Sequence, residues 1–480
     1  MAAAATSGCS ARSTEPNVAT VSPMRDLDAI IKAYDVRGIY PDQVDEDLAR
    51  DVGAAFAIVV DAYDSESRAI VVGHDMRPSG PDLVAAFADG VTGQGVDVVN
   101  IGLCSTDGLY YASGSLGLPG AMFTASHNPA QYNGIKLCRA GAAPVGQDSG
   151  LAEIKAMVAA GVADAEVAPG TVRYRDLLAD YAVFLRSLVD LDGIRPLTIV
   201  VDAGNGMAGL TAPEVLGPLG LQVTELYYEL DGTFPNHEAN PIDPANLVDL
   251  QSKVLEVGAD LGLAFDGDAD RCFAVDEHGR LVSPSTLTAL IAVRELERNP
   301  GATVIHNLIT SSAVPEIIAE HGGTPVRTRV GHSFIKAQMA ETGAVFGGEH
   351  SGHFYFREFW RADSGMLAAL HLLSAVGHAP VGTPASALLA EFERYCASGE
   401  INSEVADTAE ATARVRRAFE AEAREVNELD GLTMAGDDWW FNVRPSNTEP
   451  LLRLNVEHRD EASMAVLRDR VLAVIRSATP

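Results

Sequence analysis

Short apolar runs alternate with longer stretches of helical period along most of the chain. Ala69–Val72 comes before the helix-like segment 81–89, and Leu197–Val201 comes before the helix-like segment 212–219. Leu118–Phe123 is a further short apolar run, in which Pro and Gly mark the start of a buried strand. Strands that alternate with helices are typical of α/β domains. The pattern therefore predicts α/β layers with parallel or mixed sheets.

The chain is long enough for several domains of this kind. At about 100–200 residues per domain, 480 residues predict three or four domains, and 47% hydrophobic residues suffice for several cores. Polar or Gly-rich changes near residues 170, 280 and 395 are candidate boundaries. Residues 1–25 are rich in Ala, Ser and Thr and are predicted to be a disordered segment.

Charge and cysteine content argue against several classes of partner and site. The 66 acidic and 35 basic residues give a net charge of −31, which would repel nucleic-acid phosphates and anionic membranes. The five scattered cysteines form no C-x-x-C motif, which argues against a disulfide framework and a zinc site. No run of about 18 apolar residues and no signal-peptide core is present. We expect a cytoplasmic protein without nucleic-acid or membrane partners, and no obligate protein partner is evident.

A hydroxyl nucleophile stands in the loop that follows Leu118–Phe123. The loop reads Thr124-Ala-Ser-His-Asn-Pro, continues to Lys136, and suggests covalent phosphoryl transfer at Ser126. Taken singly, these residue types are typical of turns. Ser126 beside His127 also suggests a serine hydrolase, but the G-x-S-x-G elbow is absent and a triad base usually comes from elsewhere in the chain. The loop by itself leaves these interpretations open.

Three carboxylates at alternate positions form a second candidate site, namely Asp266, Asp268 and Asp270. Hard oxygen ligands on one side of an extended turn suit Mg²⁺. Glu277 falls at the twelfth position and raises the possibility of an EF-hand, but Arg271 stands where that loop needs Gly. The flanks instead look like strands, Leu261–Phe265 and Cys272–Val275. The pattern predicts a magnesium-binding turn between two strands.

Two further loops supply groups for a polar, anionic ligand. In Gly347–His353, glycines surround Glu349 and Ser351, whose side chains are free to reach ligand hydroxyls. His350 and His353 are spaced as a zinc pair might be, but no third ligand is evident. The last loop offers a compact anion receptor in Arg444, Ser446, Asn447 and Thr448. The candidate cations for an anionic ligand are Arg37, Lys136, Arg271, Arg444 and Arg453.

These four loops, in this order, resemble those of the phosphohexomutases, the family of phosphomannomutases and phosphoglucomutases. The resemblance extends from about Leu27 to near the C-terminus and includes Tyr34–Gly38, Gly73–Ser79 and Thr328–His332. It implies three similar α/β domains and a smaller C-terminal α+β domain around a central cleft. The implied domains are 26–170 with a phosphoserine loop, 171–280 with a metal loop, 281–394 with a sugar-recognition loop, and 395–480 with a phosphate-binding loop.

The resemblance also implies an activity and a set of residues. The expected reaction is reversible conversion of hexose 6-phosphate and hexose 1-phosphate, with mannose preferred and glucose possible. It would proceed through phospho-Ser126 and a hexose 1,6-bisphosphate, which also serves as activator, with Mg²⁺ held by the three aspartates and the phosphate on Ser126. The implied catalytic residues are Ser126, Lys136, Arg271, Arg37, His127 and His353, with Lys136 preferred to His127 for proton transfer. The implied substrate-binding residues are His332, Glu349, Ser351, His353, Arg444, Ser446, Asn447, Thr448 and Arg453.

Several alternatives remain at the level of sequence. One alternative function is that of a phosphoglucosamine mutase, although that branch of the family typically has Gln where this chain has His350. A second alternative is a Mg²⁺-dependent sugar phosphatase. Gly204–Gly209 matches G-x-G-x-x-G after an apolar run, with Glu229 lying 20 residues beyond, as in a nicotinamide dehydrogenase. Leu308 stands where bispecific family members place a lysine close to the sugar, which puts the mannose-to-glucose preference in doubt.

Overall fold

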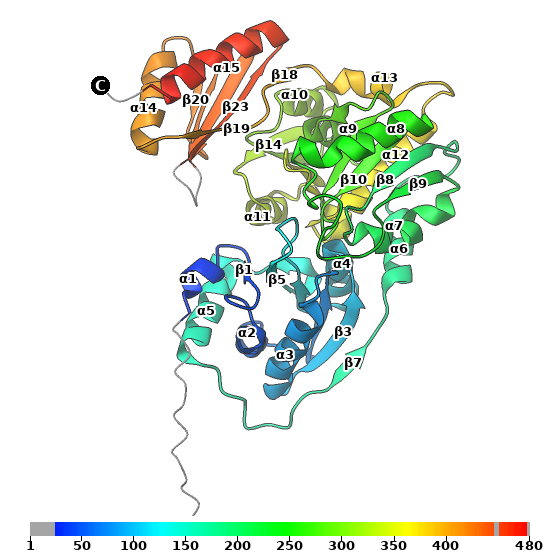
Figure 1. The fold of residues 1–480 in the computed structure, drawn as a ribbon, viewed down its shortest axis with the longest axis vertical. Helices are drawn as coiled ribbons and strands as arrows, with labels where there is room; N and C mark the ends of the chain where they lie inside the picture. The colour runs from blue at the N-terminus through cyan, green and yellow to red at the C-terminus, as the bar shows by residue number, and fades with distance from the viewer. Residues whose placement is uncertain (1–24, 446–450, 478–480) are drawn as a thin grey trace, which may run out of the picture.

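The computed structural model describes residues 25–445 and 451–477, which form four domains with a separate β-sheet each (Figure 1). The segment predicted to be disordered lies, except for Arg25, outside the described residues. Within the described part of the chain, no helix is long and apolar enough to cross a membrane. The expected fold class, three α/β domains followed by a smaller C-terminal domain, is confirmed.

Domain 1 is a mixed sheet covered by helices on both faces. The sheet order is β1-β5-β4-β2-β3-β7, with β6 beside β5. Its strands are β1 (Val36–Ile39), β2 (Ala69–His74), β3 (Asp97–Leu103), β4 (Gly120–Phe123), β5 (Tyr132–Arg139), β6 (Ala143–Pro144) and β7 (Val172–Tyr174). Its helices are α1 (Leu27–Ile30), α2 (Glu46–Val59), α3 (Gly80–Gly93), α4 (Thr106–Leu116) and α5 (Leu151–Ala160). The core under α2, α3 and α5 is separate from the core under α4.

Domain 2 contains a five-stranded sheet in the order β12-β11-β10-β8-β9. Its strands are β8 (Thr198–Asp202), β9 (Gln222–Leu226), β10 (Leu261–Phe265), β11 (Cys272–Asp276) and β12 (Leu281–Val282). Its helices are α6 (Leu178–Ser187), α7 (Ala208–Leu216) and α8 (Val248–Val257). Strands β10 and β11 are antiparallel neighbours, so the segments expected to flank the aspartate turn are strands.

Domain 3 contains a five-stranded sheet in the order β14-β13-β15-β16-β17. Its strands are β13 (Thr303–Asn307), β14 (Thr324–Thr328), β15 (Phe346–Gly348), β16 (Phe354–Phe356) and β17 (Ala362–Asp363). Its helices are α9 (Pro284–Arg298), α10 (Ala313–Glu320), α11 (His332–Thr342), α12 (Gly365–His378) and α13 (Ala385–Leu389). Buried apolar residues of α9 and α12 continue into the core of domain 2, which joins the two domains.

Domain 4 is an antiparallel sheet with two helices that share one core. The strand order is β18-β23-β22-β21-β20, with β19 also paired to β23. The strands are β18 (Cys396–Ala397), β19 (Ile401–Glu404), β20 (Glu425–Asn427), β21 (Leu432–Ala435), β22 (Trp439–Pro445) and β23 (Leu451–His458). The helices are α14 (Thr408–Phe419) and α15 (Glu461–Ile475).

The first three sheets share one topology. In each, three parallel strands are followed by an antiparallel strand that pairs with the third of them: β4 with β5, β10 with β11, and β15 with β16. The loop after the third parallel strand contains Ser126 in domain 1, the aspartates in domain 2 and Glu349 in domain 3. The polar loops therefore occupy equivalent positions at the carboxyl ends of strands, where α/β folds bind ligands.

Candidate active site

Ser126 lies at the meeting point of domains 1 and 2. Its hydroxyl donates a hydrogen bond to Asp266 Oδ2 at 2.8 Å, across 140 residues of sequence. Its backbone N–H donates to Thr124 Oγ1 at 2.8 Å. The residue has φ of +50°, a left-handed conformation that is uncommon for serine and that the surrounding contacts must hold. The strained turn directs the hydroxyl at the metal loop.

Arg77 holds the backbone of the Ser126 loop. The buried guanidinium donates to the carbonyl oxygens of Ser126 at 3.0 Å and Asn128 at 2.6 Å, and to those of Pro129 and Tyr132. Asp75, also buried, pairs with its Nε at 3.2 Å. Arg77 lies in the segment Gly73–Ser79, which resembles the family, but the sequence alone indicates no role for its side chain. The D-x-R pattern after the apolar strand is the signal that could have found it.

The metal loop brings three buried carboxylates together, with ligand atoms within 4.8 Å of one another: Asp266, Asp268 and Asp270. Lys136 Nζ donates to Asp268 Oδ2 and Asp270 Oδ2, both at 2.7 Å. Among the described residues, Oδ1 of Asp268 and Oδ1 of Asp270 are buried and accept no hydrogen bond. Buried carboxylate oxygens without donors fit a hard divalent cation, so the residues present fit the expected Mg²⁺.

Burial and neighbouring charges shift the pKa values of two of these carboxyl groups in opposite directions. Burial, followed by repulsion from Asp270 and Asp268, raises the pKa of Asp266 well above its usual range. Burial acts in the same direction on Asp270, but Lys136 and His353 hold the pKa of this carboxyl well below its usual range. Burial opposes the charge of Lys136, yet Asp268 and Asp270 raise its pKa above the usual value. Lys136 is therefore a protonated counter-ion of the metal loop.

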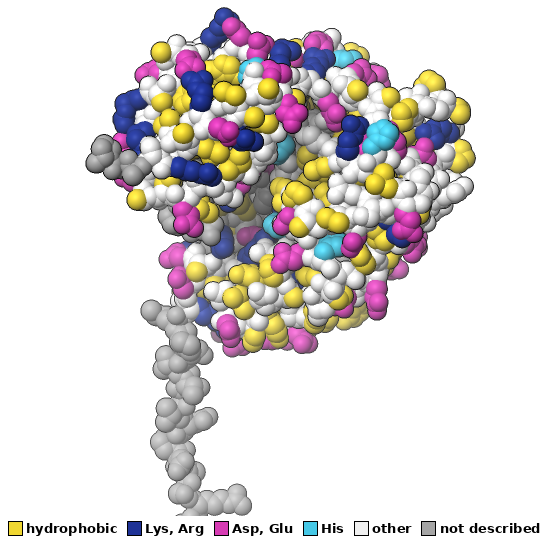
Figure 2. All heavy atoms as spheres, turned by 45° about the horizontal axis from the view of Figure 1, so that its top comes forward, with side chains coloured by type: hydrophobic (Ala, Val, Ile, Leu, Met, Phe, Trp, Pro, Cys, Tyr) yellow, Lys and Arg dark blue, Asp and Glu magenta, His cyan; other side chains and the backbone are white. Residues whose placement is uncertain are grey.

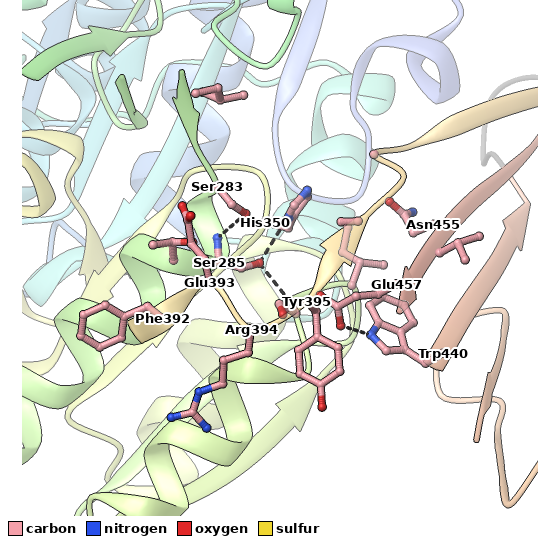
Figure 3. Close-up of a pocket in the computed structure, with 17 residues that line it drawn as sticks. Ser283, Ser285, His350, Phe392, Glu393, Arg394, Tyr395, Trp440, Asn455 and Glu457 are labelled. Carbon is pink, nitrogen blue, oxygen red and sulfur yellow. Dashed lines mark hydrogen bonds between the residues drawn. The ribbon is translucent and has the colours of Figure 1, made fainter. Parts of the chain in front are cut away.

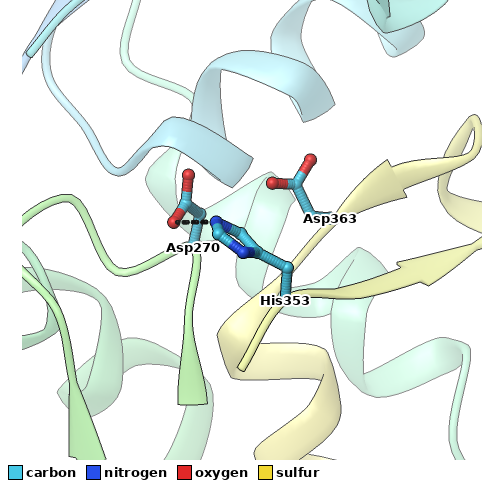
Figure 4. Close-up of side chains that lie close together, drawn as sticks. All are labelled: Asp270, His353 and Asp363. Atoms are coloured by element: carbon cyan, nitrogen blue, oxygen red, sulfur yellow. Dashed lines mark ion pairs between the residues drawn. The ribbon is translucent and has the colours of Figure 1, made fainter. Parts of the chain in front are cut away.

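Arg271 and His353 connect the metal loop with Gly347–His353, the expected sugar-recognition loop (hereafter the sugar loop). Arg271 Nε donates to His353 Nε2 at 3.2 Å, and the same ring nitrogen lies 3.5 Å from Asp270 Oδ1. Figure 4 shows His353 between Asp270 and Asp363, on segments from two domains. Asp363 in turn pairs with the buried Lys336 at 2.6 Å. Neither Asp363 nor Lys336 is singled out by the sequence, because no short-range pattern marks them.

His127 and Arg37 lie on the domain 1 side of the site. His127 Nδ1 is 3.1 Å from Ser126 Oγ. The positive charge of Arg271, then burial and the charge of Arg37, lower the pKa of His127 well below its ordinary value. Arg37 donates to Asn128 Oδ1 at 2.6 Å. His127 is thus a neutral ring beside the nucleophile at neutral pH.

Glu349 is buried and already engaged by protein donors. Its Oε1 accepts from the backbone N–H of Gly331 at 3.1 Å and from Asn307 Nδ2 at 3.3 Å, and its Oε2 accepts from Tyr355 at 2.7 Å. Ser351 Oγ lies 2.9 Å from His353 Nδ1. These bonds position the sugar loop from three other segments of domain 3. His332 begins α11, but its side chain lies outside the described residues, and Leu308 is buried.

A cavity of about 230 Å³ lies behind the sugar loop, at the junction of domains 3 and 4 (Figure 3). His350 borders it and its Nδ1 is 3.2 Å from Ser285 Oγ. On the domain 4 side, Glu457 accepts from Trp440 Nε1 at 2.5 Å and from the backbone N–H of Ser312 at 2.9 Å. Within the described part of the chain, His350 joins no potential metal cluster with His353, so the zinc pair is not assembled.

The domain 4 cations Arg444 and Arg453 stand directly opposite one another on β22 and β23. Both lie close to Glu400, at 3.8 Å and 3.4 Å respectively. The other members of the expected phosphate loop, Ser446, Asn447 and Thr448, lie outside the described residues. Figure 2 shows that the surface is hollowed where domain 4 faces the other domains.

Backbone atoms of other segments pack closely against the Gly204–Gly209 turn. A Cβ on Gly206 would lie 2.7 Å from the carbonyl oxygen of Gly267, and one on Gly209 would lie 2.2 Å from that of Tyr228. The backbone N–H of Met207 donates to the same Gly267 oxygen at 2.8 Å. Gly206 thus permits close packing of the metal loop, and Gly209 permits close packing of the segment at Tyr228. The dehydrogenase alternative is not favoured.

Comparisons with known proteins cover nearly the whole described chain. Family models of phosphoglucomutase/phosphomannomutase match as α/β/α domain I over residues 28–163, domain II over 179–279, domain III over 283–395 and the C-terminal domain over 400–474. A protein of Xanthomonas campestris pv. campestris named "phosphohexose mutases" is 40% identical over 443 residues, covering 92% of this chain and 98% of its own length. A phosphomannomutase of Salmonella typhimurium is 39% identical over 454 residues with the same coverage.

A solved structure agrees with these relatives. The crystal structure of a phosphoglucomutase/phosphomannomutase family protein from Burkholderia thailandensis is 33% identical and has a TM-score of 0.84. The match covers 95% of this chain and 99% of that one. Sequence and architecture therefore point to the same family across all four domains.

Proposed function

The chain belongs to the phosphoglucomutase/phosphomannomutase family, and from this premise we propose that it interconverts hexose 6-phosphate and hexose 1-phosphate through phospho-Ser126. The observation that carries the proposal is the 2.8 Å contact between Ser126 Oγ and Asp266 within a cluster of three carboxylates. A phosphoryl group on this oxygen would lie against buried aspartates whose donor set suits cation binding.

The three aspartates and the phosphoserine would hold Mg²⁺. A bound magnesium ion neutralises charge on the transferring phosphoryl group. The chain's own cations share this task, because Arg271 and Lys136 flank the aspartates. In the first transfer the bond from phosphorus to Ser126 Oγ breaks and a bond to the substrate hydroxyl oxygen forms. The substrate hydroxyl loses its proton as this bond forms, and Lys136 is the proposed proton-transfer partner. A cation held by Asp268 and Asp270 would offset the carboxylate charges that raise the pKa of Lys136, so that its amine could take the proton.

A second transfer completes the reaction. The hexose 1,6-bisphosphate turns around in the cleft, and its other phosphate returns to Ser126 Oγ as the first phosphate stays on the sugar. Glu349, Ser351 and His353 are the proposed sugar-binding residues. Arg444 and Arg453, with the loop between their strands, would hold the phosphate that does not react. These roles explain why one nucleophile loop and a separate cation pair occur in one chain.

Substrate preference is proposed from the sugar loop and the relatives. His350 replaces the Gln of the glucosamine-phosphate branch, and the relatives that match over most of the chain are named phosphohexose mutases and phosphomannomutases. We therefore expect mannose phosphates to be converted best, then glucose phosphates, in the cytoplasm.

Parallel assays with mannose 1-phosphate, glucose 1-phosphate and glucosamine 1-phosphate, with Mg²⁺ and a trace of activating bisphosphate, test this order. Fastest conversion of the glucosamine ester would contradict it.

The proposed reaction predicts a phosphorylated resting enzyme. Intact-mass spectrometry should show one phosphate on the wild type and none on Ser126→Ala, and the variant should lose at least about 1,000-fold in kcat because no covalent step remains. Ser187→Ala, which removes an exposed hydroxyl from α6, is the matched control and should keep both phosphate and activity. An active Ser126→Ala variant, or net phosphate release by the wild type at the rate of isomerisation, would refute a mutase acting through this serine.

A further inference from the structure

The two arginines of domain 4 form an unusual cross-strand pair. Arg444 on β22 and Arg453 on β23 are directly opposite in an antiparallel ladder, where like charges repel. The side chain of Arg444 is 16% exposed and that of Arg453 is 35% exposed, so water screens the repulsion only in part. An anion between the guanidinium groups would relieve this repulsion.

Glu400 supplies an anion to both arginines. Its Oε1 is 3.4 Å from Arg453 Nη1 and its Oε2 is 3.8 Å from Arg444 Nη2, so one carboxylate spans the two guanidinium groups. The residue follows Gly399, whose φ of +67° turns the chain just before β19. A phosphate group bound to the same two arginines would use the same donors. Glu400 therefore engages the donors that an oxyanion between the two arginines would use.

A second carboxylate, Asp430, differs from Glu400 in how firmly it is held. Asp430 lies 3.6 Å from Arg444 Nη1, and it also accepts from the backbone N–H of Val330 in domain 3 at 3.2 Å. Glu400 is one-third exposed and, among the described residues, makes no polar contact besides the two arginines. Of the two carboxylates, Glu400 is the one that a ligand can displace at little cost.

We propose that Glu400 is a built-in counter-anion of the phosphate receptor, which the substrate phosphate displaces on binding and which returns to the arginines when the phosphate leaves. The inference rests on the proposed role of Arg444 and Arg453 in holding the non-reacting phosphate. A bisphosphate that must turn around has to be released by these arginines once in each cycle. An internal carboxylate that takes the place of the phosphate weakens ground-state binding and makes this release easier. Glu400 is thus a positioning residue that acts through the arginines.

Binding without turnover tests the inference. Isothermal titration with inorganic phosphate and with glucose 1-phosphate, in EDTA, should show about fivefold tighter binding to Glu400→Gln than to the wild type, the change expected from one partly exposed ion pair. Glu420→Gln is the matched control, because it removes one exposed carboxylate from the same domain at the end of α14, where no ion pair engages it within the described region. It should change affinity less than twofold. Glu400→Asp keeps the charge and should stay near the wild type.

The direction of the effect separates a counter-anion from a structural support. If Glu400 only held the arginines in place, Glu400→Gln would bind phosphate more weakly. Unchanged or weaker binding, or equal tightening by Glu420→Gln, overturns the inference. The inference is also overturned if Glu400→Gln still tightens phosphate binding when Arg444 is replaced by Gln, because the effect must act through that arginine.

Turnover gives a second measurement. For an active mutase, Glu400→Gln should lower KM for the hexose phosphate and lower kcat about twofold or more, because bisphosphate release from domain 4 slows. Equal or higher kcat with tighter binding would remove the proposed role in release. If the wild type lacks phosphoserine and mutase activity, the proposed function fails, while the phosphate titration still decides whether Glu400 competes for the arginines.

Discussion

Lys136 shows how one residue sets the charge balance of the candidate site. It comes from β5 of domain 1, but its ammonium group lies between two aspartates of domain 2. Loss of this cation would leave buried carboxylates without their nearest positive partner, which is costly in a region of low dielectric. The same residue therefore contributes to stability, to the domain 1 and 2 contact and to the proposed chemistry.

We predict that Lys136→Met lowers the free energy of unfolding by about 3–5 kcal/mol in EDTA. Added Mg²⁺ should raise Tm more in the variant than in the wild type, because a cation that binds only the folded site offsets the missing ammonium group. Calorimetry with and without Mg²⁺ measures both effects. Lys155→Met, which breaks an exposed pair with Asp28, should cost about 1 kcal/mol or less. Equal Tm values for Lys136→Met and wild type in EDTA would contradict the prediction.

At the residue scale, the sequence marks side chains that stand together in one recognisable loop. The contact of Ser126 with Asp266 joins two segments that the sequence singles out separately. Arg77 received no role, because a buried arginine that donates to carbonyl oxygens depends on where the backbone of another segment passes. The same holds for Lys336 and Glu400, which lie outside the four loops and reach their partners only in the folded chain.

At the scale of elements, the repeated sheet topology explains why the polar loops converge. Each of the first three domains presents its functional loop after the third parallel strand, so equivalent loops face one another when the domains assemble. The β8–α7 turn then supports the metal loop, through Gly206 and the backbone N–H of Met207. The segment that matches a nucleotide-binding fingerprint in sequence serves close packing in this chain.

We predict that Gly206→Ala displaces the metal loop. The new Cβ would lie 2.7 Å from the backbone oxygen of Gly267, and backbone cannot give way as a flexible side chain can. The variant should lose about 1–3 kcal/mol of stability and bind Mg²⁺ about 10-fold more weakly, as measured by calorimetric titration. Gly217→Ala is the matched control, because φ is −53° there and no atom lies within 4 Å of the added Cβ. Undiminished Mg²⁺ affinity in Gly206→Ala would show that the turn does not position the loop.

At the scale of the whole molecule, one buried carboxylate joins three domains. Asp107 near the start of α4 accepts hydrogen bonds from Tyr181 of domain 2 at 2.8 Å and from Ser364 of domain 3 at 2.6 Å, and also from Ser105. Burial raises the pKa of Asp107 to about 6, although these hydroxyl groups lower it. Neighbouring Thr106 donates to Asp268 Oδ2 at 2.6 Å. The three-domain junction therefore lies directly beside the metal loop.

This junction predicts a defined pH dependence. Asp107 binds its proton more tightly in the folded state, with a pKa of about 6 against an ordinary value of 3.8, so its contribution to stability is full below pH 3.8 and is lost as pH rises through about 6. The stability of the wild type relative to Asp107→Asn should fall by up to about 3 kcal/mol between pH 4 and pH 6.5. Denaturant unfolding across this range measures the difference.

Glu153→Gln, on the exposed face of α5, controls for general charge effects and should follow the wild type. A flat difference between wild type and Asp107→Asn from pH 4 to 6.5 would show that the carboxyl is not perturbed by burial at the junction.

The sequence alone determined the alternation of strands and helices, the order of four polar loops and the family to which they belong. These properties depend on residue type and spacing, which are local and can be read along the chain. It also indicated that Asp266, Asp268 and Asp270 form one turn between two strands, as they do.

Which groups face each other, and what environment each one has, follows from how the domains pack. The tertiary structure placed Lys136 among the aspartates, made Asp107 a junction of three domains, and set Glu400 between two arginines. Burial, charge repulsion and cross-domain hydrogen bonds depend on distances between segments that are separated by up to hundreds of residues. No local pattern encodes those distances, so the loops could be found from sequence while the contacts between them could not.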